Sequence, residues 1–168
     1  MPRHHPHLTA QCRLATPLGP LMAAATDQGL AGLWFDDQAH HPGACAVPDQ
    51  PGHPMLQAAA QALAAYFAGQ PAIQPPLALD LHGTPFQRAV WQALLTLPHG
   101  CTSSYGRIAA QAGSPAAVRA AGAAIGRNPV SILVPCHRVL GQDGSLTGYA
   151  GGLHRKRALL QLEGIIPG

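Results

Sequence analysis

Charged residues are scarce in this chain of 168 residues, at 10%, and aromatic residues make up only 5%. No apolar run is long enough to cross a membrane, and residues 1–7 lack the apolar core of a secretory signal. The four cysteines, Cys12, Cys45, Cys101 and Cys136, form no Cys-x-x-Cys pair, which argues against a disulfide framework and a compact zinc knuckle. With 47% hydrophobic residues, we expect a soluble globular protein of the cytoplasm with reduced thiols.

The charges that are present divide unevenly along the chain. Residues 1–81 hold two arginines and five aspartates, a balance of −3, whereas residues 82–168 hold eight basic and two acidic residues, a balance of +6. A basic half suits a polyanionic partner, with nucleic acid first, although solvated surface charge explains the same balance. We divide the chain at this point into an N-terminal domain, residues 1–81, and a C-terminal domain, residues 82–168.

The N-terminal half has the pattern of a small antiparallel sheet with one helix. Short strands are predicted over residues 8–14, 21–25 and 30–35, with turn sequences between them. Residues 54–67 show helical apolar spacing, residues 36–53 and 70–76 are expected to be a loop and a link, and residues 77–81 to be extended. None of these segments has the spacing of a catalytic site.

The C-terminal half is predicted to be mostly helical, which makes the fold class α/β. Helices are expected over residues 86–95, 104–111, 116–126 and 153–162. Thr84-Pro85 and Ser114-Pro115 are pairs of a capping residue and a first-turn proline, placed to open the first and third of these helices. The second and third helices, joined at Gly113, form a candidate helix-turn-helix.

The third of these helices offers small residues and a single long basic side chain, Arg119. Such a surface suits a close contact that reads DNA shape, for example in the minor groove, with Arg119 inserted towards the bases. An alanine-rich helix packed against its neighbours is the simpler explanation. In the last helix, Arg155, Lys156 and Arg157 oppose the helix dipole, which indicates either an anionic partner or plain solvent exposure.

The strongest chemical signal is the pair Cys136-His137, which follows Pro135 in the apolar run of residues 132–140. The apolar flanks have to be buried, so the pair is expected inside the protein. A cysteine reacts as the thiolate, and His137 is the adjacent candidate for its base. Side chains of neighbours in an extended segment point to opposite faces, so contact requires a turn at Pro135 or a bridging water.

The chain contains a single glutamate, Glu163, which could hold the His137 imidazole in one tautomer. The alternative is that Cys136 is a small residue of the core. Several histidines, His4, His5, His7, His40 and His41, lie in proline-rich segments whose spacing fits no standard zinc pattern. We therefore predict no metal and no cofactor.

The segment Val134-Pro135-Cys136-His137-Arg138-Val139 resembles the active-site motif of the O6-alkylguanine-DNA alkyltransferases, also called methylated-DNA–protein-cysteine methyltransferases. Further segments resemble the other motifs of this family in order and spacing, namely residues 102–106, 119–123, 126–129 and 147–152. The match covers essentially residues 82–168. The turn at residues 16–19 resembles the start of the family's N-terminal domain, so the resemblance implies a ribonuclease H-like fold there.

The resemblance implies repair of O6-alkylguanine, and to a lesser extent O4-alkylthymine, in duplex DNA. The damaged base would be flipped out, and its alkyl group would pass irreversibly to Cys136 in a single turnover. The implied catalytic residues are Cys136 as acceptor, His137 as water-mediated base, Glu163 as its orienting carboxylate, Asn128 as the tie of the active-site turn, and Tyr105, which would rotate the nucleotide and protonate N3 of guanine. The implied DNA-binding residues are Tyr105, Arg119, Ala120, Gly122, Ala123 and Arg127, with Arg119 filling the gap left in the duplex.

The resemblance also assigns the substrate pocket to Val139, Tyr149, Ala150 and Gly151, with the carbonyl groups of Cys136 and Val139 receiving the exocyclic amine. Some relatives bind a structural zinc ion, but the aligned positions here are His7, Thr26, Ala31 and His82, an incomplete set that is not carried over. We expect a monomer on double-stranded DNA that contains O6-alkylguanine, with cooperative assembly along DNA left open and no membrane partner. Two alternatives remain: a non-catalytic module for damage recognition or transcription control, and a cysteine hydrolase.

Overall fold

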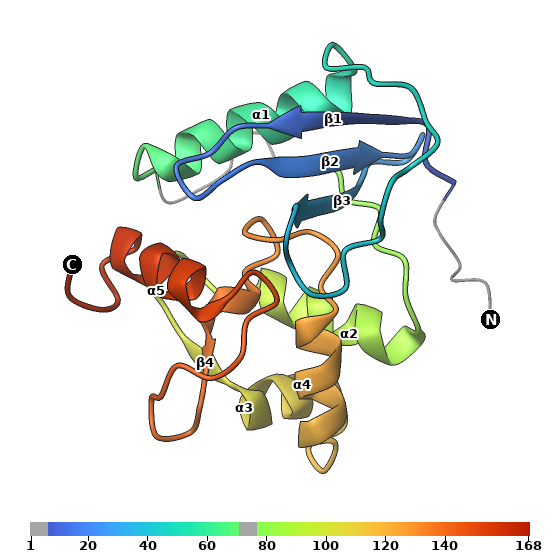
Figure 1. Cartoon of the computed structure of the whole chain (residues 1–168). Helices are drawn as coiled ribbons and strands as arrows, with labels where there is room; N and C mark the ends of the chain where they lie inside the picture. Colours follow the sequence, from blue (N-terminus) through green and yellow to red (C-terminus); the bar gives the residue numbers. More distant parts are fainter. Residues whose placement is uncertain (1–6, 71–76) are drawn as a thin grey trace.

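The structure is a computed structural model that describes residues 7–70 and 77–168. The predicted link at residues 70–76 falls almost entirely outside this range, as do His4 and His5. Three antiparallel strands form a sheet of order β1-β2-β3, and one helix covers a face of it (Figure 1). These elements are β1 (Ala10–Leu14), β2 (Leu21–Ala25), β3 (Leu30–Phe35) and α1 (Pro54–Phe67). The predicted meander and helix are therefore confirmed, although the first strand begins at Ala10 and not at residue 8.

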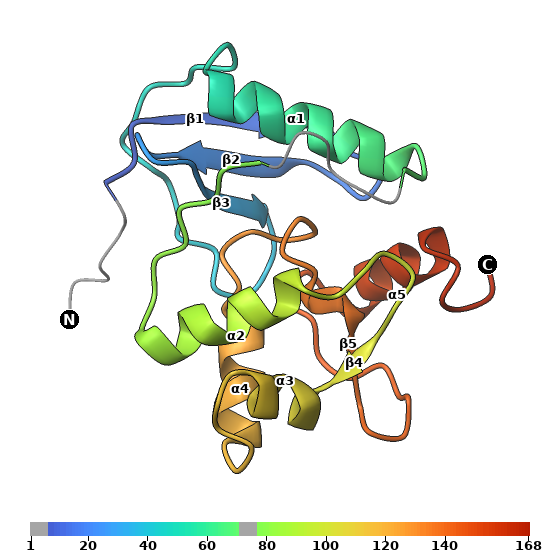
Figure 2. The ribbon, with the colours of Figure 1, turned by 180° about the vertical axis from the view of Figure 1, so that it is seen from behind.

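The remaining elements are helices with one short parallel pair of strands, and they lie together beyond the β3 edge of the sheet (Figures 1 and 2). They are α2 (Pro85–Leu95), β4 (Ser103–Ser104), α3 (Tyr105–Gln111), α4 (Val118–Gly126), a 3-10 helix (Cys136–Arg138), β5 (Val139–Leu140) and α5 (Leu153–Leu162). Thr84 opens α2 with a reciprocal capping box, in which its hydroxyl accepts from the Gln87 N–H at 3.1 Å. The α/β fold class with a helix-turn-helix, α3 and α4, is confirmed.

One local prediction in this half is wrong. The helix expected from residue 116 begins at Val118, because Ser114-Pro115 closes a turn in which the Ser114 carbonyl accepts from the Ala117 N–H at 2.9 Å. Ala117 then stands at the N-cap without a side-chain hydrogen bond. The run of residues 132–140 turns before Pro135, which is one of the two arrangements left open by the sequence, and then forms the 3-10 helix and the short strand β5.

Residues 129–131 attach the helical half to the edge of the sheet. Leu33 of β3 donates its N–H to the carbonyl of Pro129 at 2.8 Å and accepts from the N–H of Ser131 at 2.9 Å. The buried Ser131 hydroxyl also donates to Gln38 Oε1 at 2.9 Å. These bonds fix the chain that leads into Cys136 against the strand, so the sheet positions the candidate site.

Two of the three cations at the start of α5 are buried, so neither solvent exposure nor an external anion explains them. Arg155 donates to the carbonyl of Leu18 at 2.9 Å and to the Asp37 carboxylate at 2.6 Å, and its guanidinium lies 4.1 Å from the centre of the Phe35 ring. It thereby joins α5 to the sheet half through a cation–π contact and an ion pair between residues far apart in the sequence. Arg157 alone of the three is exposed.

The described residues contain no helix long and apolar enough to cross a membrane. Across residues 7–70 and 77–168, no three side chains of His, Cys, Asp or Glu gather as metal ligands. At two of the positions aligned with zinc ligands, Thr26 donates its hydroxyl to Asp80, and His82 Nε2 lies 2.9 Å from the same carboxylate. A hydrogen-bonded group of three side chains therefore joins the turn after β2 to the segment that follows residue 77. All four cysteines are free.

Candidate active site

The turn before Cys136 is held in an unusual backbone conformation. Ile132 has φ of +71°, which is rare for a β-branched residue because its branched side chain crowds the backbone. Asn128 spans this turn: its amide Nδ2 donates to the Val134 carbonyl at 2.8 Å, and its Oδ1 accepts from the Val130 N–H at 3.0 Å. Both bonds are buried, so Asn128 satisfies backbone groups that the strained turn would otherwise leave unpaired.

Cys136 lies at the start of the 3-10 helix, with 6% of its surface exposed. Burial raises the pKa of its thiol above the ordinary value, while the Asn128 side chain and the positive charge of Lys156 act in the opposite direction. The resting group is therefore a thiol at neutral pH. Its use as a nucleophile requires a base that takes the proton as sulfur reacts.

His137 and Glu163 form a fully buried pair. His137 Nε2 lies 2.5 Å from Glu163 Oε2, and both side chains have 0% exposure. The other carboxylate oxygen, Oε1, accepts from Arg138 Nε at 2.7 Å and from the Gly100 N–H at 3.0 Å. Burial alone would raise the pKa of Glu163, but the donors from His137, Arg138 and Gly100 outweigh it and hold the pKa far below the ordinary value. Glu163 is thus a permanent anion behind the imidazole.

The contact with Glu163 fixes which nitrogen of His137 can accept a proton. When Nε2–H donates to the carboxylate, Nδ1 carries the free lone pair. This Nδ1 is buried and has no hydrogen-bond partner among the described residues. Burial lowers the pKa of His137 below the ordinary value, against the opposing effect of Glu163, so the ring is neutral at pH 7. An unprotonated, oriented acceptor therefore follows Cys136 directly in the chain.

A cavity of about 230 Å³ opens onto the sulfur-bearing residue. Of the predicted pocket residues, Tyr149 and Ala150 line it together with Cys136, whereas Val139 and Gly151 do not. The Tyr149 hydroxyl is buried and has no partner among the residues described, and burial raises its pKa well above the ordinary value. Tyr149 therefore keeps a neutral hydroxyl that can still donate, and the residue lines the same small cavity as Cys136.

The backbone in and beside the cavity is held by hydrogen bonds from two sides. The buried ammonium of Lys156 donates to the carbonyls of Val139, Thr147 and Gly148 at 2.6, 2.8 and 3.2 Å. From the sheet half, the Ala39 N–H donates to the carbonyl of Ala150 at 2.9 Å. One of the two lone pairs of the Val139 carbonyl is therefore already engaged by Lys156.

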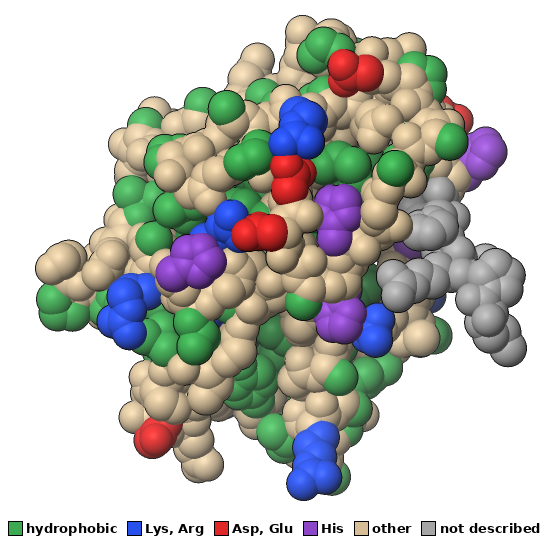
Figure 3. All heavy atoms as spheres, viewed as in Figure 1, with side chains coloured by type: hydrophobic (Ala, Val, Ile, Leu, Met, Phe, Trp, Pro, Cys, Tyr) green, Lys and Arg blue, Asp and Glu red, His purple; other side chains and the backbone are tan. Residues whose placement is uncertain are grey.

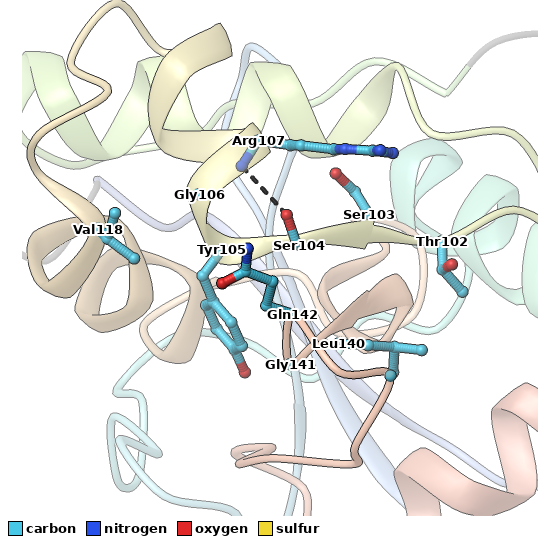
Figure 4. A pocket seen from close by; sticks show the side chains of 11 residues that line it. Thr102, Ser103, Ser104, Tyr105, Gly106, Arg107, Val118, Leu140, Gly141 and Gln142 are labelled. Atoms are coloured by element: carbon cyan, nitrogen blue, oxygen red, sulfur yellow. Dashed lines mark hydrogen bonds between the residues drawn. The ribbon is translucent and has the colours of Figure 1, made fainter.

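Tyr105 lines both this cavity and a second one of about 670 Å³, whose lining side chains are drawn in Figure 4. The Tyr105 hydroxyl donates to the Thr147 carbonyl at 3.3 Å and accepts from the Thr147 hydroxyl at 3.0 Å. Hydroxyl side chains before α3 line the larger cavity, and Ser104 Oγ accepts from the Arg107 N–H at 3.3 Å. Its lining residues include no cysteine, histidine or carboxylate, so the smaller cavity is the place for chemistry.

The predicted DNA-binding residues share the outer face of α4 and the residue that follows it. Arg119, Ala120, Ala123 and Arg127 are exposed, and Gly122 lines the small cavity beside Tyr105. Figure 3 shows a hollow in the lower part of the face viewed, with hydrophobic side chains at its base and basic side chains around the lower half of the molecule. On the opposite side of α4, Ala121, Ala124 and Ile125 are buried in the core. The helix is thus both a packing element and an exposed surface of small residues.

Sequence reasoning missed several residues of this site. Ala39 and His40, from the loop after β3, line the cavity with Cys136, although that loop had no periodic pattern to attract attention. Tyr66 of α1 donates its hydroxyl to Glu163 Oε2 at 2.7 Å, across 97 residues of chain. Its helical spacing indicated only a core position. For Lys156 the sequence does contain a signal of a role in the site, because a cation placed against the helix dipole needs a compensating partner.

Comparison with known proteins agrees with this geometry. Residues 13–81 match the ribonuclease-like domain of 6-O-methylguanine DNA methyltransferase, and residues 85–165 match its DNA-binding domain. The chain is 49% identical over 148 residues to the methylated-DNA--protein-cysteine methyltransferase of Mycobacterium tuberculosis, covering 88% of each chain, and 42% identical over 164 residues to that of Shigella flexneri, covering 92% of this chain and 95% of the relative. A crystal structure of Mycobacterium tuberculosis OGT in complex with DNA superposes with a TM-score of 0.82 at 46% identity, over 92% of each chain. The chain therefore belongs to the 6-O-methylguanine DNA methyltransferase family.

Proposed function

We propose that this protein is a methylated-DNA–protein-cysteine S-methyltransferase that repairs O6-alkylguanine in duplex DNA by transferring the alkyl group to Cys136. The observation that carries the proposal is the placement of Cys136 on a small cavity, directly followed by a buried His137 whose Nε2 is bound to Glu163. A core cysteine would need neither a cavity nor an oriented base. The relatives named above, one of them solved in complex with DNA, support the substrate class.

The proposed step is an in-line displacement at the alkyl carbon. A new bond forms between Cys136 Sγ and carbon as the bond from that carbon to O6 breaks. The thiol proton passes through a water molecule to His137 Nδ1, and Glu163 stabilises the resulting imidazolium. Tyr105 donates a proton to N3 of the departing guanine, so the base leaves neutral, and the proton held by His137 then returns through solvent to the Tyr105 phenolate. The products are unmodified guanine and S-alkylcysteine.

Reaction at this depth requires the nucleotide to leave the base stack. The small-residue face of α4 allows close approach in the minor groove, and the exposed Arg119 fills the gap that the flipped base leaves.

The same pocket would accept O4-alkylthymine less well. A thioether is a poor leaving group, so each protein molecule reacts once. We retain the division into domains of residues 1–81 and 82–168. Both domains are needed for the proposed function, because loops from each of them line the pocket.

Transfer of a labelled methyl group tests the proposal. Duplex DNA with O6-[³H-methyl]guanine should pass its label to wild-type protein up to one equivalent, and to a Cys101→Ser variant equally, because Cys101 is exposed and lies outside the cavity. A Cys136→Ser variant should take up none. Label that stays on DNA despite tight binding would favour a non-catalytic recognition module, and release of methanol beyond one equivalent would favour a hydrolase. Either outcome would overturn the proposal.

A further inference from the structure

Glu163, the carboxylate behind the His137 base, receives a hydrogen bond from the sheet half of the protein. Tyr66 of α1 is 7% exposed, and its hydroxyl donates to Glu163 Oε2 at 2.7 Å. The same oxygen lies 2.5 Å from His137 Nε2, and the Tyr66 hydroxyl is 3.5 Å from that nitrogen. Tyr66 and His137 therefore share one carboxylate oxygen.

We propose that Tyr66 is a positioning residue that sets the proton affinity of His137 by sharing Glu163 Oε2 with it. The inference rests on the proposed transfer to Cys136. A hydroxyl donor withdraws electron density from the oxygen and weakens its attraction for an imidazolium. The base is thus kept unprotonated at neutral pH, ready to accept a proton from the thiol.

Other polar groups around the pair do not take over this role. The groups that face it are Arg138 and Gly100 N–H on Oε1, Lys156 on α5, Cys136 itself, Tyr149 across the cavity, and His99, whose ring centre lies 6.2 Å from that of Tyr66. Arg138 and Lys156 both disfavour a charged His137, but neither touches Oε2. Tyr66 is the donor that competes with His137 for the same atom. Burial, together with the bond to Glu163, raises the pKa of Tyr66, so it remains a donor at every pH of interest.

This contact gives the N-terminal half a chemical role beyond packing. α1 is covered on one side by the sheet, and Tyr66 points from its last turn to the far end of α5. Any movement of α1 away from α5 would remove a donor from Glu163 and raise the proton affinity of the base. The reactivity of the cysteine is therefore tied to the contact between α1 and the helical half.

A Tyr66→Phe variant tests the inference with little change of shape. Its single-turnover transfer rate, measured between pH 5 and 9, should lose activity on the acid side at a pH about one unit higher than wild type, because His137 then binds its proton more readily. The shift should be the same on methylated duplex and on free O6-benzylguanine, since it concerns activation of sulfur and not binding of DNA. In a Glu163→Gln background, Tyr66→Phe should cause no further shift.

Thr26→Val is the matched control, because it also deletes a buried hydroxyl that donates to a carboxylate, that of Asp80, away from the cavity. Its pH profile should coincide with that of wild type. A Tyr66→Phe profile that coincides with wild type, or a rate lowered equally at every pH, would overturn the inference while leaving transfer to Cys136 intact. A wild-type protein that transfers no methyl group would instead overturn the proposed function.

Discussion

The exchange of Glu163 for Gln tests how the base is built, because it keeps the shape of the side chain and reverses one half of its hydrogen bonding. Oε1 can still accept from Arg138 and Gly100, but an NH2 group now faces Tyr66 and His137. His137 must then present an unprotonated Nε2 to the amide. Its proton moves to Nδ1, the nitrogen that should accept from Cys136.

Two magnitudes follow from this arrangement. Loss of the charge leaves Arg138, itself buried, without its carboxylate partner, and breaking a buried pair costs about 3–5 kcal/mol of unfolding free energy. The wrong tautomer removes general base catalysis, which contributes roughly 10²- to 10⁴-fold to the rate. Urea denaturation gives the first quantity, and single-turnover transfer from methylated duplex gives the second.

An exposed carboxylate supplies the control for this experiment. Asp49→Asn makes the same chemical change at the surface, so stability and rate should both stay near wild type. Circular dichroism would establish that the Glu163→Gln protein is folded under the assay conditions. A folded Glu163→Gln protein that transfers methyl within about threefold of the wild-type rate would refute the tautomer reasoning, since it would show that His137 needs no carboxylate to act.

Three further predictions concern the DNA surface, the turn and acid stability. Arg119→Ala should lower the rate of repair of duplex DNA by a larger factor than the rate of reaction with free O6-benzylguanine, because Arg119 contacts the DNA duplex and does not activate the sulfur. Equal losses of the two rates would contradict that role. Asn128→Ala should lower the free energy of unfolding by about 2–4 kcal/mol in urea titrations, since it leaves the Val130 N–H and the Val134 carbonyl unpaired in the core. A loss below about 1 kcal/mol would show that the turn is stable without the Asn128 side chain. Because the pKa of Glu163 is lowered in the folded protein, its ionised carboxylate stabilises the fold fully above the ordinary pKa of 4.5, and this stabilisation is lost as pH falls below that value. The difference in unfolding free energy between wild type and Glu163→Gln should therefore narrow on acidification. A difference that stays constant would show that the pKa of Glu163 is not lowered by folding.

Much of the fold followed from local patterns because turns and caps here have strong signals. The three strands and the helix at residues 54–67 are bounded by Gly and Pro, and Thr84-Pro85 opens α2 with a capping box. Ser114-Pro115 has the same sequence signature but closes a turn. The difference arises because α4 is set by burial of Ala121, Ala124 and Ile125, which local capping rules do not see.

The residues of the site likewise include some that local sequence features predict and others that depend on contacts between distant parts of the chain. Cys136 and His137 are adjacent, and Glu163 was recoverable because the chain has no other glutamate. The contributions of Tyr66, Ala39 and His40 depend on how the sheet half lies against the helical half, and no spacing in the sequence reports that contact. The buried Lys156 could not be assigned for the same reason: its ammonium binds backbone carbonyls in and beside the cavity, so its partner is the protein itself and not an external anion.

Peptide mapping by mass spectrometry, after one incubation with O6-methylguanine duplex, shows whether Cys136 is the residue that accepts the methyl group. We expect the peptide containing Cys136 to gain the mass of one methylene, the peptides with Cys12, Cys45 and Cys101 to be unchanged, and the DNA to contain guanine at the lesion. A repaired duplex together with an unmodified Cys136, or a methyl group found on another cysteine, would contradict this expectation.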